Sequence, residues 1–180
     1  QKAYSTCLQA YAKDHQARRY EIDTSFVKNQ YGRDPGLGSN PTDRGRKGLK
    51  LAAVVDHNGV VLGAGTFPAN RPDVTLFAPA LAAMLVSLRR IDIFADRGFD
   101  SRKNRRHATR RRLVDRIAKR GRPVYQRLPI EHTFAWIDKY RRLLHLFEQS
   151  LHKYLQYTFV ALGHLLTARF DSSVTADQAG

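Results

Sequence analysis

Three aspartates lie close together in the stretch "RRIDIFADRGFDS" at positions 89–101, and one of them is placed for chemistry. Residues 91–95 have the apolar character of a buried strand, and an ionised carboxylate is costly to bury. Asp96 follows this strand directly, and the sites of α/β folds form beyond the carboxyl ends of strands. We therefore expect Asp96 to be the functional acid, whereas Asp92 pairs with a nearby arginine and Asp100 caps a helix.

Two more acids occupy positions that a fold could bring to Asp96. Asp23 lies in "YEIDTSFVKN", whose alternation predicts a strand, and Glu131 lies in the first turn of a predicted helix, where the helix dipole favours an ionised carboxylate. Three ionised carboxylates in one cleft repel each other unless a divalent cation joins them. Mg²⁺ binds such oxygen ligands, and two such ions stabilise the attacking and leaving oxygens of a phosphoryl transfer. Each acid alone has an ordinary structural explanation, so the metal-site hypothesis rests on the set of three.

The elements that must position these acids follow the order strand, hairpin, helix, strand and helices. The hairpin is indicated by two apolar runs around the turn at 56–59, and the segment 29–48, rich in glycine and proline, predicts a mobile loop before it. A helix capped by Asp73 follows, and residues 90–95 form a short inner strand. This order predicts an α/β domain with a mixed sheet, in which three antiparallel strands and a parallel strand are flanked by helices.

Three further helices are predicted after the inner strand. The first is capped by Ser101 and runs to Gly121. The second begins near Pro129 and continues through "IEHTFAWIDKYRRLLHLF", and the third is capped by Ser150. The tail at 172–180 is polar, and we expect it to fray.

The net charge limits the choice of partners. The chain has 31 Lys plus Arg against 16 Asp plus Glu, a formal charge of +15. A globular domain this basic requires a polyanionic partner, so nucleic acid is the leading candidate and an anionic membrane surface the second. The segment 102–122 is dense in arginine and lysine, which favours phosphate contacts over a solvated helix face. The single Cys7 excludes an internal disulfide, and no apolar run of about 18 residues spans a membrane.

Four separate blocks support a more specific hypothesis. "YEIDTSFVKN", "NPTDRGRKGLKL", "FADRGFDS" and "RLPIEHTFAWIDKYRRL" follow one another within residues 20–168. Together they resemble the blocks of DDE transposases of bacterial insertion sequences, to which the eukaryotic Harbinger-type transposases are related. The resemblance implies an RNase H-like fold, a catalytic and metal-binding triad of Asp23, Asp96 and Glu131, and Mg²⁺ as cofactor with Mn²⁺ as a substitute.

The same resemblance implies what the protein acts on. It implies metal-dependent cleavage and strand transfer of DNA, with transposon ends and target DNA as partners. It also implies a homodimer without a membrane partner. The expected location is the cytoplasm or nucleoid of a bacterium, or the nucleus if the host is a eukaryote.

The family signature around the catalytic glutamate is kept in part. Arg127 has the expected spacing, because three residues separate it from Glu131. Val124 occupies the place of the signature tyrosine, with Tyr125 next to it, and Asp138 occupies the place of the signature lysine, with Lys139 next to it. These differences concern contacts with substrate DNA more than metal binding. The residues that we expect to contact DNA are Arg44, Arg46, Lys47, Arg102, Lys103, Arg105, Arg106, Arg110, Arg111, Arg127, Lys139 and Arg142.

We expect residues 1–171 to form a single catalytic domain. The family recognises transposon ends through a separate N-terminal helical region, and little of such a region fits before Tyr20, so residues 1–19 are interpreted as its helical remnant. Two alternatives stay open. One is a non-catalytic DNA-binding remnant or domesticated protein, and the other is an RNase H-like nuclease that lacks strand transfer.

Overall fold

A mixed sheet forms the centre of the computed structural model, which describes residues 1–86, 91–119 and 128–177, with side chains as far as residue 168. The strands are β1 (Arg19–Asn29), β2 (Gly38–Ser39), β3 (Lys47–Asp56), β4 (Val61–Pro68), β5 (Asp92–Ala95), β6 (Val114–Ile117) and β7 (His145–Leu146). β3 pairs with β1 and β4 in antiparallel orientation, whereas β5 pairs with β1 and β6 in parallel orientation. The predicted mixed sheet is therefore confirmed, and its two halves meet at β1.

The alternation in β1 separates two faces of the sheet. Tyr20 and Ile22 are fully buried on one face, where Ile93 of the neighbouring β5 packs with them. Glu21 and Asp23 point to the opposite face, because successive side chains of a strand alternate.

The β3–β4 hairpin is the one that the apolar runs predicted. Asp56 builds its turn, because its carboxylate accepts the backbone N–H groups of Asn58 and Val60, both at 2.9 Å. Gly59 has a φ of 75°, a conformation that glycine adopts without strain. The buried carboxylate of Asp56 also accepts the hydroxyl of Tyr11 at 2.7 Å, so the turn is tied to the N-terminal helix.

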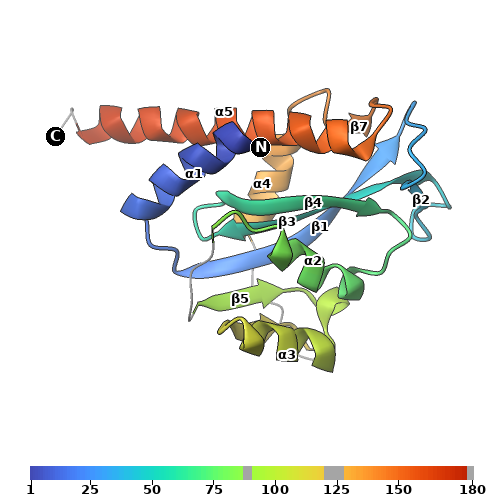
Figure 1. The fold of residues 1–180 in the computed structure, drawn as a ribbon, viewed down its shortest axis with the longest axis horizontal. Coiled ribbons are helices and arrows are strands. Elements are labelled where there is room, and N and C mark those ends of the chain that lie inside the picture. The colour runs from blue at the N-terminus through green and yellow to red at the C-terminus, as the bar shows by residue number, and fades with distance from the viewer. Residues whose placement is uncertain (87–90, 120–127, 178–180) are drawn as a thin grey trace.

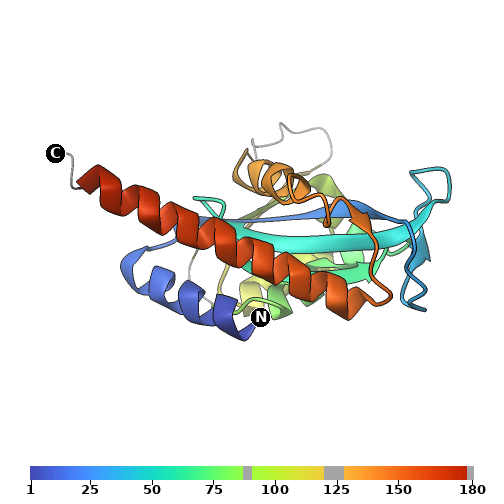
Figure 2. The ribbon, with the colours of Figure 1, turned by 90° about the horizontal axis from the view of Figure 1, so that it is seen from above.

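Helices cover both faces of the sheet. They are α1 (Lys2–Asp14), the 3-10 turn η1 (Asp73–Thr75), α2 (Phe77–Ala82), the 3-10 turn η2 (Arg97–Phe99), α3 (Arg102–Arg110), α4 (Leu128–Asp138) and α5 (Leu151–Asp177). Figure 1 shows α1 and α5 side by side near β4, where the rings of Tyr4 and Phe159 lie 5.5 Å apart. Figure 2 shows α4 on the other side of the strands from α1. Within the described residues, none of the helices combines the length and apolar character needed to cross a membrane.

The helix predicted from Asp73 is shorter than expected. Asp73 begins the η1 turn, and α2 ends at Ala82. The chain after α2 packs against β4, where Met84 forms an isolated antiparallel β-bridge with Gly63. This approach is so close that a Cβ on Gly63 would lie 2.5 Å from the carbonyl oxygen of Ala83, which leaves no room for a continuing helix.

The helix capped by Ser101 also ends early, at Arg110 and not at Gly121. Arg112 has a φ of 58°, which breaks the helical path, and Leu113 is buried immediately after it. The chain continues as β6, a strand that the sequence did not predict.

The last two helices differ from the prediction in opposite ways. The helix from Pro129 ends at Asp138, and the following chain turns so that β7 can pair with β1. The final helix continues to Asp177, through much of the segment expected to be a frayed tail. The segment 29–48 contains β2, and its mobility stays a prediction.

Candidate active site

Asp23 and Asp96 follow the last paired residues of two parallel strands. The register between β1 and β5 ends with Ile22 opposite Ala95, and the next residue on each strand is the aspartate. Both side chains are half-buried. Asp96 accepts the N–H of Gly98 at 2.8 Å, which closes the η2 turn at the carboxyl end of β5. The structure therefore brings these two predicted acids to neighbouring positions at the edge where α/β sheets form their sites.

The edge of β1 beside Asp23 is open within the described part of the chain. β5 pairs with residues 19–22 of this edge, and β7 pairs with residues 28–29. Between them no described strand covers residues 23–27, because β5 ends and the Asp96 turn leads the chain away.

Glu131 lies in the first turn of α4, the helix that packs against β1 and β3. The preceding residue, Ile130, donates its N–H to Glu21 of β1 at 3.2 Å. Asp23 lies two residues after Glu21 and so points to the same face of the sheet, the face that α4 covers. The structure thus brings the helix of Glu131 to the side on which Asp23 lies, and the side chain of Glu131 is exposed there.

The three acids do not form a ready-made metal cage. Among the described residues, no three histidine, cysteine or acidic side chains lie close enough together to hold an ion. Mg²⁺ is commonly bound by one or two carboxylates, with water and substrate phosphate completing its shell. Asp23 and Asp96 occupy neighbouring positions of the sheet and supply carboxylates of that donor chemistry, and Glu131 stands on a helix that packs against β1.

A cluster beside Asp96 was missed by sequence reasoning. Asp73 accepts the hydroxyl of Thr24 at 2.9 Å and the ammonium of Lys50 at 2.7 Å. A Cβ placed on Gly98 would lie 2.9 Å from an Asp96 carboxylate oxygen and 3.5 Å from an Asp73 carboxylate oxygen, so both acids flank the η2 turn. In the sequence Asp73 carried only the signal of a helix cap after a proline, and nothing indicated its partners.

The structure also shows the partners of Asp92 and Asp100, the other two aspartates of the stretch at 89–101. Asp92 pairs with Arg116 at 3.0 Å, as predicted. Asp100 does not cap α3, because Ser101 does so by accepting the N–H of Asn104 at 3.1 Å. The carboxylate of Asp100 instead binds Arg105 at 2.9 Å.

The basic residues of α3 fall into two groups. Arg105 is bound internally by Asp100, by Asp115 and by the carbonyl of Ile117. Arg111 is exposed and donates to the carbonyl of Leu81 at 2.9 Å. The other predicted DNA contacts of this helix are exposed to solvent and are Arg102, Lys103, Arg106 and Arg110.

The positive charge of α3 affects a histidine on the same helix. Burial and the neighbouring charges of Arg111, Arg110 and Lys103 hold the pKa of His107 below its usual value. His107 therefore lies beside the predicted DNA-contacting side chains of Arg111, Arg110 and Lys103, whose charges act in the same direction as its burial.

The predicted DNA contacts outside α3 that fall within the described residues are exposed, and several also have protein partners. Arg46 lies 3.7 Å from Asp43, and Arg44 and Lys47 lie in the same connection to β3. Lys139 lies over the ring of Trp136, 3.9 Å from its centroid.

Arg142 binds Glu148 at 2.8 Å and so has a structural partner as well. Asp138, which stands where the family signature has a lysine, is exposed over much of its surface, and partial desolvation of its carboxyl group raises its pKa. Arg127, Val124 and Tyr125 lie outside the described residues.

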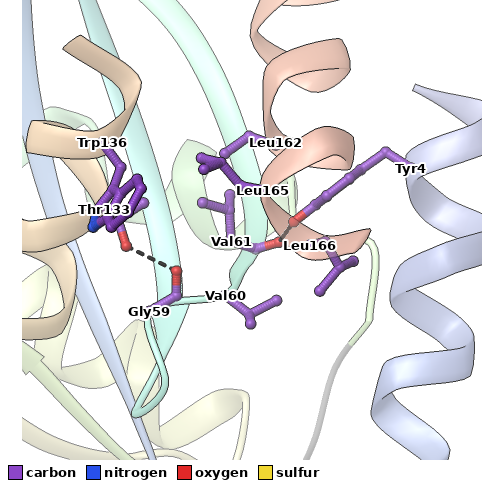
Figure 3. A pocket seen from close by; sticks show the side chains of 9 residues that line it. All are labelled: Tyr4, Gly59, Val60, Val61, Thr133, Trp136, Leu162, Leu165 and Leu166. Carbon is purple, nitrogen blue, oxygen red and sulfur yellow. Dashed lines mark hydrogen bonds between the residues drawn. The ribbon is translucent and has the colours of Figure 1, made fainter. Parts of the chain in front are cut away.

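A small pocket elsewhere in the molecule does not belong to this site. It has a volume of about 20 Å³, room for roughly one water, and is lined mainly by apolar side chains of α1, α5 and β4 (Figure 3). Thr133 of α4 borders it and donates to the carbonyl of Gly59 at 2.8 Å. None of the three acids lines the pocket, so it is a packing gap between elements and not a substrate site.

Comparison with known proteins identifies the family of this chain. Residues 14–166 match the family described as the transposase DDE domain. The chain is 39% identical, over 147 residues, to a protein of Burkholderia cepacia named as a transposase for insertion sequence element IS402, and the match covers 73% of this chain and 66% of that protein. This chain thus matches slightly less than two thirds of its curated relative.

Two solved structures are similar to this chain to different degrees. The catalytic core domain of BIV integrase has a TM-score of 0.52 at 9% identity, covering 81% of this chain and 83% of the other. The catalytic domain of Mos1 mariner transposase has a TM-score of 0.49 at 13% identity, covering 98% of this chain and 92% of the other. The mixed sheet and the likeness to the integrase core confirm the RNase H-like fold, and the family match over most of the chain establishes that this protein belongs to the DDE transposase-domain family.

Proposed function

We propose that this domain carries out metal-dependent DNA strand cleavage and strand transfer, with Asp23, Asp96 and Glu131 as its catalytic acids. The observation that supports the assignment most is the placement of Asp23 and Asp96 directly after the last residue pair between β1 and β5, beside a stretch of β1 with which no described strand pairs on that side. Glu131 completes the set from a helix that packs on the same strand. The proposal includes Mg²⁺ as the resident ion, with Mn²⁺ as a substitute, and transposon ends and target DNA as substrates of a homodimer.

The residues divide the work between binding and chemistry. The exposed basic side chains of α3 would bind phosphates without reading bases, which holds the DNA against the molecule. The Asp23 and Asp96 carboxylates would hold the ion at the carboxyl edge of the sheet, and Glu131 would approach it from α4. When bound, the ion supplies charge stabilisation for the attacking and leaving oxygens of a phosphodiester.

Asp96→Asn tests this proposal against a control on the same strand, Asp92→Asn. The first variant keeps the size of the side chain but replaces a charged ligand by a neutral amide, so it should lose Mg²⁺- or Mn²⁺-dependent cleavage and joining of end-bearing DNA. It should bind DNA as well as the parent, because α3 is unchanged. The control removes only a partly exposed pair with Arg116 and should cost at most about 1 kcal/mol of stability and little activity.

The outcomes separate the two alternatives from the proposal. Equal cleavage by the parent and Asp96→Asn would refute the catalytic assignment. Binding of DNA without cleavage by either protein would favour a non-catalytic remnant. Cleavage without joining in the parent would favour a nuclease of the same fold.

A further inference from the structure

Glu21 is a buried carboxylate that contacts elements carrying all three proposed catalytic acids. Its side chain is 1% exposed, and it lies on β1 two residues before Asp23. One carboxylate oxygen accepts the N–H of Ile130, the residue before Glu131, at 3.2 Å. The other lies 3.0 Å from the guanidinium of Arg19. An ionised group at this depth is costly unless partners such as these compensate its charge.

Arg19 extends the connection to the third element. Its guanidinium lies over the ring of Phe94, 5.5 Å from the centroid. Phe94 belongs to β5, stands opposite Glu21 in the strand register and precedes Asp96 by two residues. The pair of Arg19 and Glu21 is thus joined to the strand of Asp96 on one side and to the helix of Glu131 on the other.

The contact with α4 is the more specific of the two. The first N–H groups of a helix have no partner within the helix, and a carboxylate that accepts one of them fixes where the helix begins. Glu21 accepts such a group from the first turn of α4, so the start of α4 is held against β1 at the level of the acids. Apolar packing alone does not determine the height of a helix along a strand so closely, because it has no directional bond.

We propose that Glu21, with Arg19, is a positioning residue that holds the first turn of α4, and with it Glu131, in register with Asp23 and Asp96. The inference rests on the catalytic role proposed above for these acids. It gives Glu21 no contact with metal or substrate. Its effect on the reaction passes through the position of Glu131.

The test compares Glu21→Gln and Glu21→Ala with Asp56→Asn. Glutamine keeps an acceptor for Ile130 but loses the charge beside Arg19, whereas alanine loses both interactions. Asp56 is a matched control, because it is also a buried carboxylate that accepts backbone N–H groups. It lies at the end of β3, where it pairs with Tyr20 and not with Asp23 of β1. The turn that Asp56 builds also contacts α4, through the bond from Thr133 to Gly59, so Asp56→Asn reports what a loss of stability and of that contact does while the bond between Glu21 and Ile130 is kept.

The first measurement is amide hydrogen exchange of residues 130–132 without metal or DNA. Glu21→Ala should speed exchange there relative to the rest of α4, and Glu21→Gln should have a smaller effect. Asp56→Asn should leave these amides protected relative to the rest of the helix. Exchange at 130–132 that is the same in all three variants would overturn the proposed coupling.

The second measurement is Mn²⁺ affinity by calorimetry, together with the kinetics of DNA cleavage. Loss of a residue that orients metal ligands commonly costs about 10–100-fold in metal affinity or activity. We expect a loss of that size in Mn²⁺ affinity and kcat for Glu21→Ala, with KM for DNA unchanged. If Asp56→Asn at equal stability weakens Mn²⁺ binding as much, the positioning role is wrong while the catalytic proposal stands. A parent protein that binds no Mn²⁺ would instead overturn the catalytic proposal and this inference with it.

Discussion

The ammonium of Lys50 lies 2.7 Å from the carboxylate of Asp73, next to the turn that carries Asp96. Lys50 comes from β3 and Asp73 from η1, and Thr24 of β1 donates to the same carboxylate oxygen. The three elements are thereby joined on the face of the sheet opposite α4. Asn104 strengthens this link, because its amide donates to a carbonyl of η1 and to one of η2, both at 2.8 Å.

The Lys50–Asp73 pair should contribute more to stability than an ordinary surface pair. Its side chains are 16% and 31% exposed, so solvent screens them only in part. We expect a double-mutant cycle with Lys50→Met and Asp73→Asn, measured by urea unfolding, to give a coupling energy on the order of 1–2 kcal/mol. The exposed pair of Asp43 and Arg46, at 3.7 Å, is the control and should give about 0.5 kcal/mol or less. Equal coupling in the two cycles would contradict this expectation.

Replacing Gly98 should affect activity more than folding. A Cβ at this position would lie 2.9 Å from an oxygen of Asp96, so in Gly98→Ala the carboxylate must rotate away. Misplacing a catalytic group by about 1 Å costs on the order of 100-fold in rate, whereas the lost hydrogen bond costs about 1 kcal/mol of stability.

Gly163→Ala provides the matched comparison. Gly163 lies within α5, and a Cβ there meets nothing within 4 Å. This variant should raise the free energy of unfolding by about 0.5–1 kcal/mol and leave cleavage unchanged. Full activity of Gly98→Ala in the same assay would show that the position of the Asp96 carboxylate is not critical.

Exposed arginines of α3 should determine the salt dependence of DNA binding. Each phosphate contact contributes about one unit to the slope of log affinity against log salt concentration. We expect Arg106→Gln and Arg110→Gln each to make this slope shallower by about one unit, equally for any DNA sequence. Lys13→Gln, an exposed change in α1, should leave the slope unchanged. If none of the α3 variants alters the salt dependence of DNA affinity, the DNA does not bind to α3.

Arg105→Gln should behave differently from its neighbours on α3. Its guanidinium binds two carboxylates and a carbonyl, so its removal leaves Asp100 and Asp115 without this partner. We expect a loss of about 1–3 kcal/mol in the free energy of unfolding, measured by urea titration. The salt slope should change less than in Arg106→Gln. A stability equal to that of the parent would show that these bonds contribute nothing.

The pKa of His107 predicts how stability depends on pH. Burial and nearby positive charges lower this pKa in the folded state, so the unfolded chain takes up a proton at higher pH than the folded protein does. The contribution of neutral His107 to the free energy of unfolding is therefore complete above the pKa of about 6.5 in the unfolded chain, and it is lost as the pH falls below that value. We expect the urea concentration at the unfolding midpoint to decrease as the pH is lowered from about 7.5 to about 5.5. His107→Gln should make this decrease smaller. His152→Gln, an exposed change in α5, should reduce it less.

Several parts of the fold were predictable from local patterns. The β3–β4 hairpin follows from two apolar runs around a turn that Asp56 and Gly59 can build, and β1 follows from strict alternation. Asp92 was rightly assigned to an arginine, because an acid within a short apolar strand needs a counter-charge. The hairpin and β1 depend on residues close together in the chain, whereas the need of Asp92 for a counter-charge follows from its own strand and its partner Arg116 lies 24 residues away.

β6 and the early end of α3 were not predictable in this way. The segment "VDRI" has neither a clear apolar alternation nor a long apolar run, and Val114 is 46% exposed. It becomes a strand because β5 offers a free edge and Arg105 can reach Asp115 across the intervening turn. Both conditions exist only after the chain has folded.

The sequence by itself determined the basic charge of this protein, the order of its strands and helices up to Asp96 apart from the two-residue β2, and which acids are candidates for catalysis. These depend on residue type and short-range periodicity. Only the tertiary structure decided that Glu21 supports the start of α4 and that Lys50 and Asp73 stand beside Asp96. The partners of these side chains are far away in the chain, and a buried or half-buried charge acquires its meaning from the groups that surround it in space.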